Sequence, residues 1–233
     1  MRKILLFFGI VFFSQTHAQT MTAMTTSNGI AQIPTFRLGN PAEMVFFSTN
    51  ITKFLEFSPD FMFNLKNGKP WLVDTWLRGN MKLDSAGRWI GSIGMNWSLY
   101  FQKYPGTTED VTQTIRYPNP EFRLKFIQNK VNTFTADYQY MWAVEKKYGV
   151  YGSYYSLLYS RTQELKKFIL NGNMNAFYLH LSDGTRGIST AFDANIMHAK
   201  SGLFLGFQIV EPVTLNNAMF DKAFFLGITR KLH

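Results

Sequence analysis

The stretch RWIGSIGMNWSLYF, residues 88–101, alternates between two kinds of side chain along almost its whole length. The odd-numbered positions form one parity and hold the mainly apolar set Trp89, Gly91, Ile93, Met95, Trp97, Leu99 and Phe101. The even-numbered positions form the other parity and hold Arg88, Ser92, Gly94, Asn96 and Ser98, with Ile90 and Tyr100 as exceptions. A period of two places these sets on opposite faces of a β-strand, whereas a helix would mix them. The stretch therefore predicts a long strand with one apolar and one polar face.

The same alternation recurs along the chain, and turn residues separate the runs. It is clear in residues 74–84, 133–145 and 187–198. Asn67-Gly68 and Asp183-Gly184 supply the positive φ angles that tight hairpins require. Ordinary strands have roughly five or six residues, whereas a tilted strand that crosses a membrane needs about nine to eleven. These runs are of the longer kind, and no stretch has the apolar face of a helix, so the pattern predicts an antiparallel meander.

Ten strands are predicted from this pattern. They span residues 54–66, 69–83, 88–102, 121–127, 133–145, 149–161, 166–181, 186–198, 202–210 and 222–232. An even number places both ends of the chain on one side, and the long connections 103–120 and 211–221 then lie on the opposite side. Residues 19–53 are assigned to a polar N-terminal lead-in. Because Met44 to Thr52 could form another strand, the count ranges from eight to twelve.

The composition agrees with strands that meet two different environments. The chain has 233 residues, of which 17% are aromatic and only 17% are charged, against about 25% charged in an average soluble domain. The absence of cysteine excludes disulfides, Cys-ligated zinc, iron–sulfur clusters and a thiol nucleophile. A mean hydropathy of −0.11 excludes a multi-span helical membrane protein. It allows a barrel, in which polar residues dilute the apolar ones.

Residues 1–18 match a cleavable secretory signal. Two basic residues precede an apolar run from Ile4 to Phe13, and small residues lead up to Ala18. The run is too short to cross the roughly 30 Å hydrocarbon layer as a helix. We therefore expect cleavage after Ala18 and export of the remaining chain. Loss of the two basic residues and of no acid lowers the formal charge from +9 to +7.

A signal peptide, long meandering alternations and aromatic-rich strand ends together resemble a bacterial outer-membrane β-barrel. The aromatic clusters are Trp71 and Trp76, Trp89 and Trp97, Tyr138 to Trp142, and Tyr151 to Tyr159, which resemble the girdles at membrane interfaces. The resemblance is to the architecture of a Gram-negative envelope protein and covers residues 54–232. One departure is the final residue His233, where such barrels typically carry an aromatic residue. The resemblance implies three partners: outer-membrane lipid, lipopolysaccharide and the barrel-assembly machinery.

A sheet that faces lipid must close on itself, because no water is present to satisfy its free edges. The predicted fold class is therefore all-β, a closed antiparallel up-and-down transmembrane β-barrel of about ten strands, over residues 54–233. The aromatic and aliphatic parity then faces lipid, and the polar parity faces the lumen. A soluble lipocalin-like barrel would invert this arrangement and bind an apolar ligand, and periodicity alone does not separate the two.

Seven polar residues share the predicted lumen parity and form the candidate solute path. They are Asp74, Arg78, Asn96, Asp137, Gln139, Asp193 and Asn195. They could line a narrow aqueous path for a small polar solute, or fill a small interior with ion pairs and hydrogen bonds. The basic residues at strand ends suit lipid phosphate groups or a solvated rim. No basic cluster interleaved with aromatic residues occurs, so we expect no nucleic-acid partner.

The sequence contains no phosphate-binding loop, serine-hydrolase elbow or metalloprotease motif, so we expect no catalysis and no cofactor or metal. His198 and Ser201 resemble the His and Ser of outer-membrane lipid A deacylases, although Gly202 replaces the expected asparagine. An ordinary turn at a strand end explains the same residues.

The sequence favours a narrow pore or small-solute uptake channel, or a structural or assembly barrel with a filled lumen. The alternatives are a soluble barrel that binds an apolar ligand and a lipid-modifying hydrolase.

Overall fold

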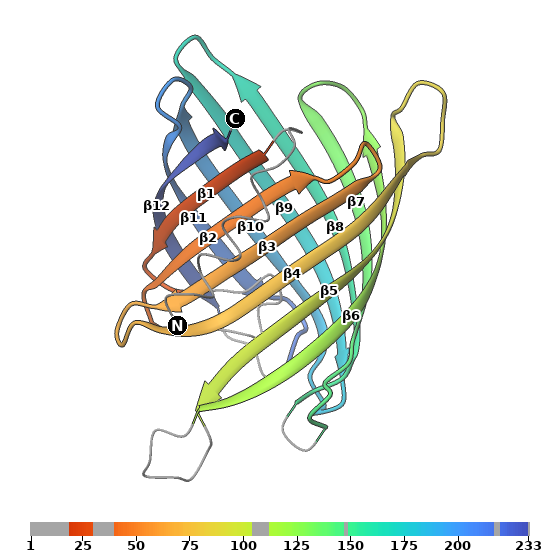
Figure 1. The fold of residues 1–233 in the computed structure, drawn as a ribbon, viewed down its shortest axis with the longest axis vertical. Coiled ribbons are helices and arrows are strands. Elements are labelled where there is room, and N and C mark those ends of the chain that lie inside the picture. Colours follow the sequence, from red (N-terminus) through yellow and green to blue (C-terminus); the bar gives the residue numbers. More distant parts are fainter. Residues whose placement is uncertain (1–18, 30–39, 104–111, 147–148, 217–219, 233) are drawn as a thin grey trace.

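Twelve antiparallel strands form one closed barrel in the computed structural model, which describes residues 19–29, 40–103, 112–146, 149–216 and 220–232 (Figure 1). In chain order they are β1 (Gln19–Thr26), β2 (Ala42–Asn50), β3 (Leu55–Asn64), β4 (Lys69–Lys82), β5 (Trp89–Lys103), β6 (Thr112–Ile127), β7 (Asn132–Met141), β8 (Gly152–Glu164), β9 (Phe168–Leu181), β10 (Arg186–His198), β11 (Leu203–Pro212) and β12 (Asp221–Leu232). Each strand pairs with the next, and β12 pairs with β1. The predicted closed barrel is confirmed. The predicted signal peptide, residues 1–18, lies outside the described residues.

The two strands beyond the predicted ten come from residues 19–53, the segment assigned to a polar lead-in. That assignment is wrong for β1, whereas β2 confirms the alternative of another strand near Met44 to Thr52, and the count of twelve lies within the predicted range; both strands complete the barrel wall between β12 and β3. At the closing seam the hydroxyl groups of Thr22 and Thr229 lie 2.9 Å apart in a hydrogen bond. The period-two signal is faint in β1 because threonine occupies both of its faces. The strand forms because β12 and β2 would otherwise keep unpaired edges.

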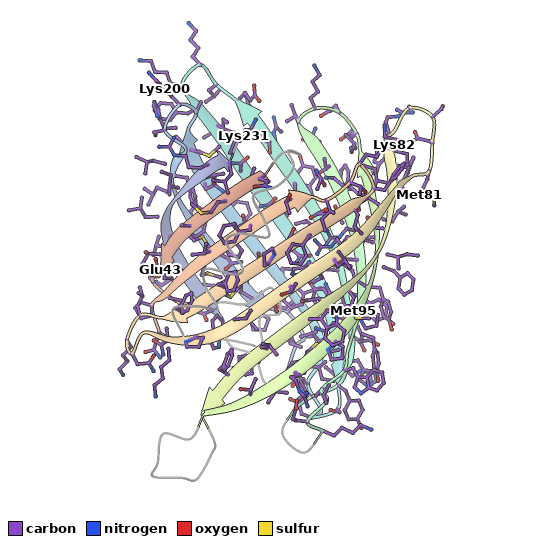
Figure 2. The ribbon with its side chains drawn as sticks, in the orientation of Figure 1. Glu43, Met81, Lys82, Met95, Lys200 and Lys231 are labelled. Atoms are coloured by element: carbon purple, nitrogen blue, oxygen red, sulfur yellow. The ribbon has the colours of Figure 1, made fainter. Side chains whose placement is uncertain are left out.

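Both ends of the described chain lie at the same end of the barrel, which we call the terminal rim. The connections 83–88, 128–131, 165–167 and 199–202 lie at this rim, and Figure 1 shows them at the end that carries the C label. The opposite end, the far rim, carries the turns 65–68 and 182–185 and the segments 142–146 and 213–216. The predicted sides of the short turns are confirmed. Figure 2 shows Lys82, Lys200 and Lys231 together at the terminal rim.

The strand β6 begins at Thr112, so the predicted connection 103–120 is wrong for most of its length. Pro118 and Pro120, inside that predicted connection, both lie in β6 and are paired with β5 residues in the ladder. The pairing of β6 with β7 begins only at Glu121. The prolines therefore lie where β6 has a strand neighbour on one side only, and their missing amide hydrogens cost no ladder hydrogen bond.

The two parities face the environments that the sequence predicts. On β5, Ile93 and Trp97 are 67% and 56% exposed on the outer surface, whereas Ser92 and Asn96 are buried in the lumen. Outward aromatic rings form ladders across β6 to β9, one of which runs through Phe122, Tyr138, Tyr155 and Tyr178. The described residues include no helix of the length and apolarity needed to cross a membrane.

Three of the predicted girdle residues lie in the lumen instead, and one of them is Tyr154 of β8, which has no exposed surface. Trp71 and Trp76 are only 3% and 4% exposed. Trp76 has the inward parity of Asp74. Trp71 lies where the ladder between β3 and β4 shifts register and leaves it without a cross-strand partner, so it turns inward beside Leu72.

Candidate pore interior

A network of charged side chains lies on the inner wall from β3 to β7. Its central row consists of successive cross-strand neighbours, which are Glu56, Arg78, Gly94, Glu121 and Gln139. The Nε of Arg78 donates to Oε2 of Glu121 at 2.5 Å. Its Nη1 donates to Oε1 of Glu56 at 3.4 Å. One arginine on β4 thereby joins carboxylates from β3 and β6.

Arg123 extends this network toward β7. Its Nη2 donates to Oε1 of Glu121 at 2.7 Å and lies 3.5 Å from Oδ2 of Asp137. Gln139 donates to the same Asp137 oxygen at 3.0 Å. The Glu121 side chain has no exposed surface, so its two arginine contacts are shielded from solvent. Buried charges persist only when they are paired in this way.

Gly94 makes room for the arginine that crosses β5. A Cβ at this position would lie 2.9 Å from Cγ of Arg78 and 3.0 Å from Oε2 of Glu121. Any larger residue would therefore displace the ion pair. The guanidinium also lies over the ring of Trp76, with its Cζ 4.1 Å from the ring centroid. Contacts therefore hold Arg78 on several sides, and side chains fill this part of the lumen. We call it the packed wall.

Apolar side chains pack across the far end of the lumen in two clusters that we call the apolar layer. The larger cluster contains Ile115, Tyr117, Met141, Ala143, Tyr154, Phe177, Leu179, Leu181, Val210, Leu215 and Ala223, and the smaller contains Ala42, Met44, Met62, Trp71 and Leu72. Tyr100 packs against both clusters. Leu215 enters from the segment after β11, where the backbone amides of residues 213–215 bond to the carbonyl of Ile188. The apolar layer narrows the lumen at the far rim.

A cavity of about 570 Å³ lies beside these packed groups, along the inward faces of β1 to β4 and β9 to β12. It is lined by Thr22, Met24, Thr26, Asn28, Met44, Phe46, Asp60, Met62, Asp74, Asn171, Asp193, Asn195, Met197, Phe204, Gln208, Phe225 and Thr229. The volume lies in the range of about 300–1,000 Å³ that is typical of small-molecule sites. We call this space the lumen cavity.

The structure divides the seven candidate residues between the lumen cavity and the packed wall. Asp74, Asp193 and Asn195 line the cavity. Arg78, Asn96, Asp137 and Gln139 are buried outside its lining. On the cavity wall, Nδ2 of Asn173 donates to Oδ1 of Asp193 at 2.7 Å. Nδ2 of Asn171 donates to Oδ1 of Asn195 at 2.9 Å.

Sequence reasoning missed three acidic residues of the lumen, namely Glu56, Asp60 and Glu121. A signal was present for Glu56 and Asp60, because they share one parity of the predicted strand 54–66 while phenylalanines occupy the other. Parity alone does not reveal that Asp60 lies directly opposite Asp74 on β4. That pairing depends on the register between the two strands.

His198 and Ser201 do come together at the terminal rim. Oγ of Ser201 lies 2.9 Å from Nδ1 of His198, and the backbone amide of Ser201 donates to the same nitrogen at 3.3 Å. The imidazole packs edge-on against Phe168. Within the described part of the chain, no carboxylate lies within ion-pair distance of His198, so the pair lacks the orienting third group of a hydrolase triad. The contacts are those of a capped turn.

Comparison with known proteins identifies the fold. No protein-family model matches the chain, and a search of curated proteins found no match. Among solved structures, the "KdgM porin" has a TM-score of 0.57 at 8% identity, covering 92% of this chain and 99% of that one. The "KdgM porin in complex with disordered oligogalacturonate" gives 0.57 at 9%, covering 93% and 100%. A "NanC porin" structure gives 0.56 at 11%, covering 91% and 100%. The chain has the fold of outer-membrane β-barrel porins.

Proposed function

We propose that this protein is an integral outer-membrane barrel that acts, without catalysis, as a narrow pore for small solutes. The lumen cavity carries the proposal, because it is a solute-sized space with both polar and apolar lining residues, beside the packed wall and the apolar layer. Outer-membrane lipid and lipopolysaccharide would surround the barrel, which the assembly machinery would insert.

The outer surface supports a membrane location. Large apolar side chains such as Ile93, Leu157 and Leu205 are 67%, 66% and 58% exposed on successive parts of the wall. A soluble barrel would bury these side chains and expose the polar parity, whereas here polar groups such as Asn96 and Glu121 are buried. An outer surface of this kind is stable in lipid and prone to aggregation in water.

The shape of the lumen supports a narrow pore rather than a wide one. The ion-pair network occupies the wall from β3 to β7, and the apolar layer narrows the far rim, so the solute path runs along β1 to β4 and β9 to β12. Apolar constrictions restrict passage by excluding water as well as by size. The KdgM and NanC structures that share this fold are both porins, and one KdgM structure is a complex with disordered oligogalacturonate.

Conductance of the purified, refolded barrel in planar bilayers tests the proposal. We expect small single-channel steps in KCl. Across a KCl gradient, Asp193→Lys on the cavity wall should shift the reversal potential in the direction of greater anion selectivity. Glu43→Lys is the control, because Glu43 is exposed on the outer face of β2 (Figure 2). Absence of conductance from a barrel with heat-modifiable gel mobility would contradict the pore.

A structural or assembly barrel is the second candidate, and the packed half of the lumen favours it. The buried network around Glu121 and the apolar layer are what a filled barrel would contain. A correctly folded, non-conducting barrel would support this role.

The hydrolase hypothesis predicts that His198→Ala abolishes deacylation of lipid A, and undetectable deacylation by the unaltered protein would remove it.

A further inference from the structure

We propose that the lumen cavity binds an organic cation, a protonated or quaternary amine that carries an apolar body. The inference deepens the proposed function and rests on it for the route by which the solute enters the cavity. It assigns a solute class to a chain whose overall charge, +9, is of the opposite sign to the cavity.

The charge of the lumen cavity is acidic. Asp60, Asp74 and Asp193 are among its lining residues, and those that the structure describes include no lysine, arginine or histidine. Within the described residues none of these three aspartates forms an ion pair. The nearby arginines Arg78 and Arg123 are already engaged by the carboxylates of the wall network. A positive solute would find carboxylates without competing cations.

Asp60 and Asp74 lie directly opposite each other on β3 and β4 and both line the cavity. Like charges in facing positions of a ladder repel each other, so the pair is unfavourable in the empty barrel. Asp74 is only 8% exposed, and its Oδ1 is buried with no hydrogen-bond partner. A cation between the two carboxylates would relieve the repulsion, and a protonated amine would also donate a hydrogen bond to this oxygen.

The rest of the lining favours an organic cation over a metal ion. No group of three or more His, Asp or Glu side chains in the described part of the chain could hold a metal. Apolar side chains line the same cavity as the carboxylates: Met24, Met44, Phe46, Met62, Met197, Phe204 and Phe225. Methionine packs adaptably against irregular apolar bodies, and aromatic faces attract ammonium groups. The combination matches an amine with a hydrocarbon or aromatic portion.

Calorimetric titration of the detergent-folded barrel with benzyltrimethylammonium tests the inference. Benzyl alcohol and benzenesulfonate are the neutral and anionic probes of similar shape. We expect the cation to bind at least about tenfold more tightly than either, because only the cation gains Coulomb attraction. In Asp60→Asn and Asp74→Asn the preference should fall about tenfold. Asp84→Asn in the exposed turn after β4 should leave it unchanged, since asparagine can still accept from the Trp89 amide.

The same preparations, measured in planar bilayers, separate this inference from the pore. Equal binding of the three probes, or an unchanged preference in Asp60→Asn and Asp74→Asn, would overturn the cation site even if the barrel conducts KCl. Preferential cation binding by a barrel that does not conduct would remove the pore and leave the cation site supported. The asparagine variants remove repulsion and keep side-chain volume, so heat-modifiable mobility should show that they fold.

Discussion

Replacing Glu121 by glutamine should lower the free energy of unfolding of the barrel by about 3 kcal/mol. The glutamine removes the charge to which Arg78 donates two hydrogen bonds and Arg123 one. Loss of one partner from a buried ion pair costs about 3–5 kcal/mol. Each arginine keeps a second carboxylate, Glu56 at 3.4 Å and Asp137 at 3.5 Å, so the loss should fall at the lower end.

Urea unfolding of the barrel in lipid vesicles, followed by tryptophan fluorescence, measures this loss. Glu145→Gln is the matched control, because it also removes a carboxylate from an arginine pair. Its partner Arg116 is 59% exposed at the far rim, so we expect a loss of only about 0–1 kcal/mol. Equal losses in the two variants would refute the reasoning, since the lumen network would then contribute no more than a solvated ion pair.

Three further outcomes follow from the geometry. In single-tryptophan variants, brominated lipid should quench Trp97 on the outer face and leave Trp76 in the lumen unquenched; equal quenching would contradict the assigned faces. Gly202→Ala should destabilise the barrel by about 2 kcal/mol more than Gly184→Ala, as measured by urea unfolding. Both glycines have positive φ, but only at Gly202 would a Cβ collide with a backbone carbonyl. Leu215→Ala should raise single-channel conductance by opening the apolar layer, and unchanged conductance would mean that this layer does not limit flow.

Much of the fold was predictable where strands alternate strongly. The run at residues 88–101 predicted β5 and both of its faces, and the turn dipeptides predicted where hairpins lie. Prediction failed where local signals were weak or misleading. Threonine on both faces concealed β1, and Pro118 and Pro120 concealed the first half of β6. In each case the missing information was a neighbouring strand, which a local pattern does not contain.

For the candidate site, the sequence predicted only which face of each strand points into the lumen. The inward direction of Asp74, Asp193 and Asn195 follows from alternation, but alternation treats Asp137 in the same way. The structure places Asp137 in the packed wall and the other three on the lumen cavity. The difference arises from which strands meet across the lumen and where large side chains fill it.

The sequence by itself determined that long strands alternate between an apolar and a polar face, because a period of two is a property of each strand alone. Only the tertiary structure decided that twelve strands close the barrel, that Trp71 turns inward, and that Asp60 faces Asp74. These features depend on register, which turn lengths, bulges and closure set jointly for all strands. The lumen cavity, and with it the solute class that we propose, is a product of that register.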